Sequence, residues 1–264
     1  MVFQKCRRAE KMILNEGGNV FKDESGEATT QRIQQADVDP TLQWIEKITG
    51  MDHINMKLGS TGIKSSSGDL DVAVDKDKYD KAEVEKKLMA WVTKNHPDDE
   101  PRQWVAKSGI NVHFKAPING KESNGFVQLD LMFGEPEFMK FALKGYGDDT
   151  KYKGVHRAIL IASVAKFHGY KFNSQTGLVD RINNKTVSKD PDEIAQYILG
   201  DNAKGADLDS VDSIVAKIKS DPNYEAMTAD AVKWFEKDGL TLPESVRLEG
   251  REWFRDTLDK LNEV

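Results

Sequence analysis

The chain has 264 residues, of which 38% are hydrophobic and 31% charged, and its formal net charge is −6. This length suits one large domain or two modest ones. The interspersed charges exclude a disordered chain and predict a soluble globular protein, and no apolar run is long enough to span a bilayer. The basic N-terminus lacks the apolar core of a secretion signal and Cys6 is the single cysteine, so we expect a cytoplasmic protein without internal disulfides.

Charge is unevenly distributed along the chain. Residues 140–189 contain ten Lys and Arg against three Asp and Glu, whereas residues 190–264 contain nine against eighteen. A basic stretch in an acidic protein either binds a polyanion or forms a solvated face without a ligand. The composition favours neither interpretation over the other.

Residues 1–50 are predicted to be mostly helical or irregular. A short helix is expected over 7–14. A second helix is expected to begin at Asp39-Pro40, because Asp is a common cap and Pro is favoured in the first turn, and to end at Gly50.

A loop and strand with two acidic residues form the most informative segment, which reads LGSTGIKSSSGDLDVAV over residues 58–74. A Gly/Ser-rich loop leads into a strand that contains Asp69 and Asp71. Successive strand residues face opposite sides of a sheet, so these two aspartates share one face and the apolar residues between them share the other. Two carboxylates beside a loop with free backbone N–H groups suit Mg²⁺ and a triphosphate.

Further α/β structure is expected after this strand. Asp80 and Glu83 have the spacing of a capping box and predict a helix start. Residues 110–114 and 127–133 alternate in polarity, and the linker between them contains Pro, Asn and Gly, which favours an antiparallel pair. His113, on the first of these strands, is predicted to be structural.

Asp130 lies on the second of these strands, on the face opposite its apolar residues. A carboxylate within such a strand costs free energy unless it is solvated, paired or bound to a metal. We therefore predict that Asp130 is the third carboxylate of a site with Asp69 and Asp71.

From Glu135 onward the chain is predicted to be almost wholly helical. Apolar spacing and caps indicate helices at 136–144, 155–168, from 191, and at 211–219, 226–237 and 244–261. The predicted fold class is α+β, with an α/β domain over residues 1–140 and a helical domain over residues 141–264.

The ordered Gly-Ser, Asp-x-Asp and Asp130 pattern resembles the DNA polymerase beta-like nucleotidyltransferase superfamily, which includes poly(A) polymerases, CCA-adding enzymes, family X polymerases and protein-modifying toxins. The resemblance covers about residues 56–133, and residues 66–72 are most similar to family X. The chain as a whole is also similar to uncharacterised nucleotidyltransferase-like proteins of tailed phages. The resemblance implies a palm, in which helices flank a mixed or antiparallel sheet.

The resemblance also implies a reaction: transfer of a nucleoside monophosphate from a nucleoside triphosphate such as ATP to an acceptor hydroxyl, with release of pyrophosphate. Two Mg²⁺ ions, or Mn²⁺, would be held by the catalytic carboxylates Asp69, Asp71 and Asp130. Residues 155–166 are similar to a helix of poly(A) polymerase-like enzymes in which a lysine contacts the triphosphate. The implied nucleotide-binding residues are Gly59, Ser60, Lys64 and Lys166.

Three alternatives remain for the function: two differ in the acceptor, and the third has no transfer reaction. A nucleic-acid 3′-hydroxyl, RNA favoured over DNA, would suit the basic stretch at 140–189, where Tyr146 and Tyr152 are candidates for stacking on a base. Transfer to a protein or a small molecule would suit the acidic C-terminal stretch. A catalytically inactive nucleotide-binding module is the third alternative. No membrane partner is expected.

Overall fold

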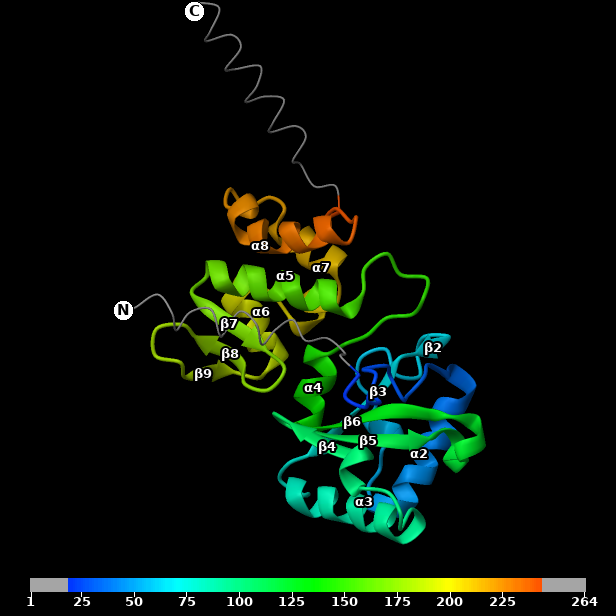
Figure 1. Cartoon of the computed structure of the whole chain (residues 1–264). Helices are drawn as coiled ribbons and strands as arrows, with labels where there is room; N and C mark the ends of the chain where they lie inside the picture. Colours follow the sequence, from blue (N-terminus) through cyan, green and yellow to red (C-terminus); the bar gives the residue numbers. More distant parts are fainter. Residues whose placement is uncertain (1–18, 244–264) are drawn as a thin grey trace, which may run out of the picture. The chain divides into compact units, whose positions relative to one another are not determined.

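The computed structural model describes residues 19–243, so the predicted helices over 7–14 and 244–261 lie outside the described residues. The chain divides between Pro136 and Glu137 into two compact units. Within the described part, seven α-helices and three small β-sheets make an α+β fold (Figure 1).

The first unit is built on a mixed four-stranded sheet. In spatial order its strands are β3 (Asp69–Asp75), β6 (Phe126–Gly134), β5 (Asn111–Pro117) and β4 (Val105–Ser108). Strands β3 and β6 are parallel, and the other two pairs are antiparallel. The predicted antiparallel pairing of residues 110–114 with 127–133 is therefore confirmed.

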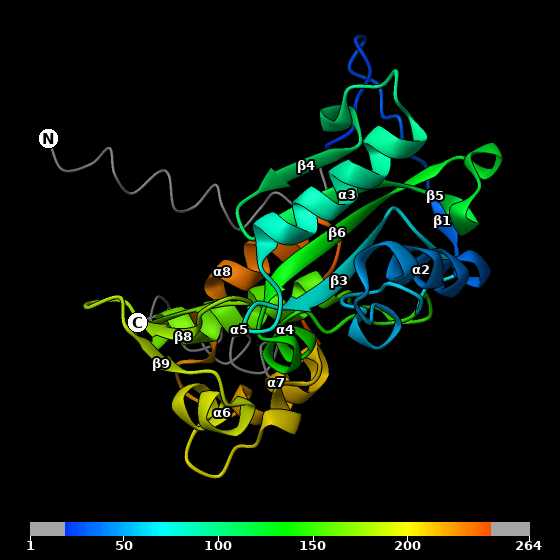
Figure 2. The ribbon, with the colours of Figure 1, turned by 90° about the horizontal axis from the view of Figure 1, so that it is seen from below.

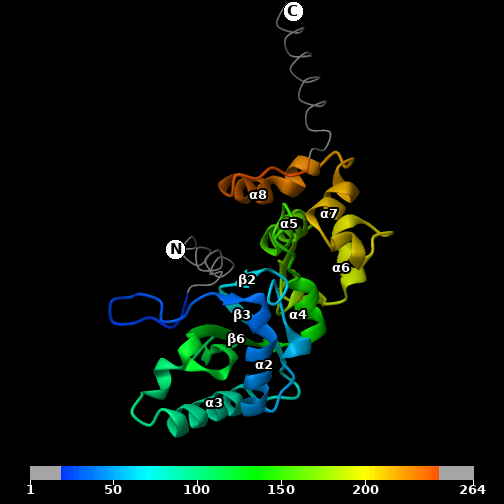
Figure 3. The ribbon, with the colours of Figure 1, turned by 90° about the vertical axis from the view of Figure 1, so that its right-hand side faces the viewer.

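Two helices, α2 (Gln35–Thr49) and α3 (Lys81–Asn95), pack on one face of this sheet (Figures 1 and 3). Figure 2 shows α3 running alongside β4. The side chain of Asp80 accepts hydrogen bonds from the N–H groups of Ala82 and Glu83, which confirms the predicted helix start. The core between helices and sheet includes the fully buried residues Leu42, Ile45, Leu70, Leu88, Val112, Leu129 and Leu131.

Helix α2 begins earlier than predicted. It starts at Gln35 rather than near Asp39, so Pro40 lies inside it. Strand β1 (Ile33–Gln34) pairs with β2 (Ser66–Ser67) and runs straight into the helix, while Val38 is buried in the core. Tertiary packing thus outweighs the missing N–H of Pro40. The predicted end is confirmed, because Gly50 caps the helix with a φ of 74°.

Short 3₁₀ helices connect the main elements. They are η1 (Ile54–Met56), η2 (Pro101–Gln103), η3 (Ile118–Gly120), η4 (Glu122–Asn124) and, in the second unit, η5 (Gly205–Leu208).

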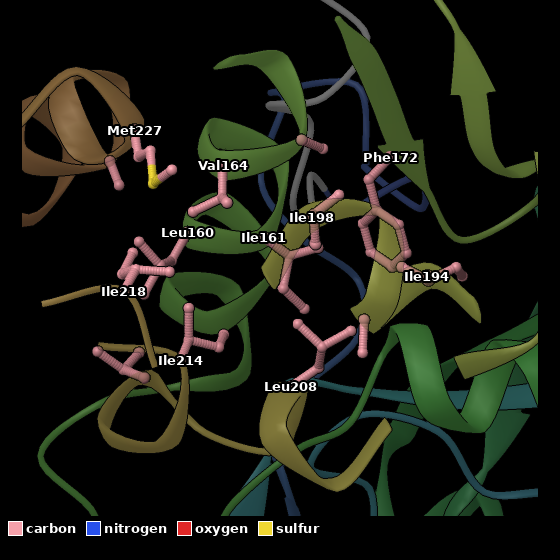
Figure 4. Close-up of a cluster of buried hydrophobic side chains, with 14 of the residues drawn as sticks. Leu160, Ile161, Val164, Phe172, Ile194, Ile198, Leu208, Ile214, Ile218 and Met227 are labelled. Atoms are coloured by element: carbon pink, nitrogen blue, oxygen red, sulfur yellow. The ribbon is translucent and has the colours of Figure 1, made fainter. Parts of the chain in front are cut away.

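The described part of the second unit has five α-helices: α4 (Pro136–Ala142), α5 (Gly154–Phe167), α6 (Pro191–Leu199), α7 (Val211–Ile218) and α8 (Tyr224–Lys237). Figure 4 shows Leu160, Ile161 and Val164 of α5 pointing into a cluster formed with side chains of α6, α7 and α8. Within residues 19–243, no helix is both long enough and apolar enough to cross a membrane.

The prediction that the chain is almost wholly helical after Glu135 is wrong, because the second unit also contains a three-stranded antiparallel sheet. Its strands are β7 (Tyr170–Asn173), β8 (Gly177–Asp180) and β9 (Thr186–Ser188). Phe172 and Leu178 pair across β7 and β8 and are buried in the helical core. Gly177 has a φ of 73°, and an added Cβ would lie 2.3 Å from the carbonyl oxygen of Ser188, so this tight turn requires glycine.

Candidate metal centre

Three carboxylates meet on the face of the first sheet that is turned away from α2 and α3. Asp71 in β3 lies directly opposite Asp130 in the parallel strand β6, and Asp69 lies one pair further along the same face. One oxygen from each of the three side chains lies within 4.8 Å of the others. Two oxygens bound to one Mg²⁺ are at most about 4.2 Å apart, so small side-chain movements would let this group hold a divalent cation.

The negative charges of Asp69 and Asp130 repel each other. Burial raises the pKa of Asp69, the charge of Asp130 raises it further, and Arg32 partly opposes the shift. The ionised form of Asp69 is therefore less favourable in the folded protein than in water. A cation bound to the group would relieve this repulsion.

Asp130 is more enclosed than the other two acids, with an exposed fraction of 8%. It faces away from the hydrophobic core, as predicted, but it does not face solvent. Its Oδ1 lies 2.7 Å from Nδ1 of His113, and its Oδ2 accepts a hydrogen bond of 3.2 Å from Nε2 of Gln128. Sequence reasoning assigned no role to His113 at this site, although its position two residues from Asn111 and Lys115 on an alternating strand could have placed it on the polar face.

The loop with Gly59 and Ser60 forms a tight turn beside β3. The N–H of Leu58 donates to the carbonyl oxygen of Asp71 at 2.9 Å, and the N–H of Asp71 donates to Oγ1 of Thr61 at 3.0 Å. Gly59 has a φ of 58°, in the left-handed region that favours glycine. The turn is therefore fixed directly to the strand that contains Asp69 and Asp71.

Some backbone N–H groups of this turn are paired within the turn, and others have no acceptor among residues 19–243. Those of Ile63 and Lys64 donate to the carbonyl oxygen of Ser60, at 3.0 and 3.3 Å. Among residues 19–243, no acceptor pairs with the N–H groups of Gly59, Ser60 and Gly62. Successive N–H groups in such a turn form a concave site for an anion. The side chain of Lys64 is half-buried at the end of the turn.

Arg32 is a cation of this site that sequence reasoning missed. It precedes β1, and its Nη2 donates to the carbonyl oxygen of Ser66 at 2.9 Å. The β1–β2 pairing brings it toward β3, where its charge acts on Asp69. The sequence carried no signal for this contact, because it depends on pairing between two-residue strands far apart in the chain.

The remaining predicted residues lie in the second unit. Lys166, near the end of α5, forms an ion pair with Asp230. Tyr152 is buried, and its hydroxyl donates to the carbonyl oxygen of Thr241 at 2.7 Å, so the expectation that it stacks on a base is wrong. Tyr146 is half-buried and donates to the carbonyl oxygen of Asp209.

Comparison with known proteins identifies no family. No protein-family model matches the chain, and no curated protein matches it. The chemistry of this chain is therefore to be sought in its own features: the acidic group, the adjoining turn and the mixed sheet that positions them.

Proposed function

We propose that the protein is a metal-dependent nucleotidyltransferase. The observation that carries this proposal is the meeting of Asp69, Asp71 and Asp130 on one sheet face, with one oxygen of each within 4.8 Å of the others. They lie beside a turn in which three N–H groups have no acceptor among residues 19–243. Three carboxylates are hard oxygen donors, the ligand type preferred by Mg²⁺ and Mn²⁺.

The carboxylates have distinct roles in this proposal. Asp69 and Asp71 would hold the cations, and Asp130 would share one of them. When bound, such cations lower the pKa of an acceptor hydroxyl and offset the charge that develops at the phosphorus. The three side chains contribute position and charge rather than covalent chemistry.

The turn next to the acids would bind the rest of the nucleotide. The N–H groups of Gly59, Ser60 and Gly62 would donate to the β- and γ-phosphates, and the ammonium group of Lys64 would offset their charge. Lys166 is a further phosphate ligand in the proposal, and it would have to exchange its ion pair with Asp230 for the triphosphate.

A nucleic-acid 3′-hydroxyl is the acceptor that we propose, with RNA favoured. Several cations of the 140–189 stretch are already neutralised: Lys140 by Glu137, Lys144 by Asp209 and Lys166 by Asp230. Of the cations of this stretch that remain, three lie on or beside the small sheet of the second unit.

We term these three residues the β7–β9 cations: Lys171 in β7, and Arg181 and Lys185 in the connection between β8 and β9. All three side chains are exposed, and no carboxylate of residues 19–243 pairs with them. Ile182, at the turn between β8 and β9, is 93% exposed. Exposed cations around an apolar side chain can contact the phosphates and a base of one strand.

Incubation of the full chain with Mg²⁺, α-labelled nucleoside triphosphates and separate RNA, DNA, protein and hydroxylated small-molecule acceptors tests the proposal. We expect labelled RNA longer by one or more nucleotides, and no label in an Asp71→Asn variant. Label on a polypeptide or small molecule would retain the reaction and replace the acceptor. If no acceptor is labelled and the protein does not bind Mg²⁺-nucleotide, the proposed nucleotidyltransferase function is wrong.

A further inference from the structure

Both oxygens of Asp130 are held by buried neighbours. His113 Nδ1 lies 2.7 Å from Oδ1, and Gln128 Nε2 donates to Oδ2 at 3.2 Å. The exposed fractions of His113 and Gln128 are 4% and 3%. Asp69 and Asp71 are half-buried, so Asp130 is the most enclosed member of the acidic group.

The hydrogen bonds define how these two neighbours are oriented. An ionised carboxylate only accepts hydrogen bonds, so Nδ1 of His113 donates to Asp130. The opposite ring nitrogen, Nε2, lies 2.7 Å from Oγ of Ser108 and accepts from that hydroxyl when the ring is neutral. The imidazole is thus held at both ends.

Gln128 is oriented in a similar way. Its Oε1 accepts the backbone N–H of Val20 at 2.8 Å, so its NH₂ group is the end that faces Asp130. The strand pairing also brings His113 to Asp130. In the sheet, Asp130 of β6 lies between Asp71 of β3 and His113 of β5.

We infer that His113 is a positioning residue that orients Asp130 as a metal ligand, with Gln128 as its weaker counterpart; this inference rests on the proposed function. Ligating carboxylates are held by hydrogen bonds from neighbouring side chains, and loss of such a partner costs 10- to 100-fold in metal affinity. Each carboxylate oxygen has two lone pairs, so these hydrogen bonds leave both oxygens able to bind a cation.

Titration of the full chain with Mn²⁺, followed by the electron paramagnetic resonance signal of the free ion, tests the inference without any transfer reaction. His113→Leu is expected to weaken Mn²⁺ binding by about 10- to 100-fold. His113→Asn places an amide N–H near the position of Nδ1 and is expected to retain affinity within about threefold. Gln128→Leu should weaken binding by less than His113→Leu.

His96→Leu is the matched control. It removes a different imidazole of the same unit, one that stacks on Trp104 at a centroid distance of 4.1 Å, and it should leave Mn²⁺ affinity unchanged. Thermal melting of each variant without metal separates loss of fold from loss of Mn²⁺ affinity. If His113→Leu does not fold, His113→Asn and Gln128→Leu provide the test.

The outcomes are distinguishable. Equal Mn²⁺ affinity in wild type, His113→Leu and Gln128→Leu would overturn the positioning role and leave the proposed function standing. A loss in His113→Leu that His113→Asn fails to restore would also overturn it, because the hydrogen bond would then not be the cause. Absence of Mn²⁺ binding by the wild type would overturn both the inference and the proposed function.

Discussion

Asp71 and Asp130 occupy opposing positions on adjacent parallel strands, β3 and β6, and their side chains emerge on the same face of the sheet. The two strands are joined through a helix and an antiparallel pair, so segments far apart in the chain contribute one ligand group. This relationship makes the two aspartates the first targets for substitution.

Asp71→Asn and Asp130→Asn are each expected to reduce nucleotidyl transfer by on the order of 10³-fold, because each removes a negative charge that would hold a cation. The amide replaces the carboxylate with little change in volume, so circular dichroism should be unchanged. Asp75→Asn, at the far end of β3, is the matched control and should retain activity. Full turnover by either site variant would remove these residues from the catalytic group.

Asp69→Asn is expected to stabilise the metal-free protein at pH 7. Because the pKa of Asp69 is raised by burial and by Asp130, the folded protein binds more protons than the unfolded chain above pH ~4. The free energy of unfolding therefore decreases as the pH rises through this window, and the amide removes the penalty. Thermal melting should show a higher midpoint without metal and a smaller increase on adding Mg²⁺. A lower midpoint in metal-free buffer would contradict the electrostatic argument.

Charge reversal of the β7–β9 cations is expected to weaken RNA binding. Neutralisation of three phosphates on a single strand contributes about 2 to the slope of log affinity against log salt. In the triple variant Lys171→Glu/Arg181→Glu/Lys185→Glu, the magnitude of this slope should fall by about 2. Fluorescence anisotropy of labelled RNA at several salt concentrations measures it. Lys140→Glu/Lys144→Glu, which alters cations already paired with carboxylates, is the comparison. Effects in proportion to the number of reversed charges, three in one variant and two in the other, would show that only net charge matters.

His53 is expected to make the first unit sensitive to acid. Burial lowers the pKa of His53 from 6.5 to about 4, although Glu46 and Asp52 oppose the shift. Between these values the unfolded chain binds more protons than the folded one, so the free energy of unfolding falls as the pH falls, by up to about 3 kcal/mol. Urea denaturation at pH 7 and pH 5 should show this loss in the wild type and a smaller loss in His53→Gln. Equal pH dependence in both proteins would assign the loss to other groups.

The face on which each aspartate of the acidic group lies could be predicted from the sequence, because it depends on a local rule. That the three meet depends on the register between β3 and β6 and was expected only from the family resemblance. Alternation with a period of two placed Asp69 and Asp71 on one face and Asp130 on the polar face of its strand. The same rule applied to His113, but its contact with Asp130 requires the register between two strands, which periodicity does not specify.

The elements that were missed depend on tertiary packing. Strands β7, β8 and β9 have four, four and three residues, too few for alternation to be distinguished from irregular chain. They are stabilised by Phe172 and Leu178 against the helical core. The early start of α2 likewise follows from the β1–β2 pair rather than from the cap-like residues Asp39 and Pro40.

The alternation of β6 has a consequence for how this site can change. Val127, Leu129, Leu131 and Phe133 are buried in the core, and Asp130 lies between them on the other face. A one-residue insertion or deletion in this strand would exchange the two faces, so the core and the ligand group would be lost together. Insertions in the linker before Phe126 carry no such cost. Selection for a stable fold therefore also preserves the alignment of the carboxylates.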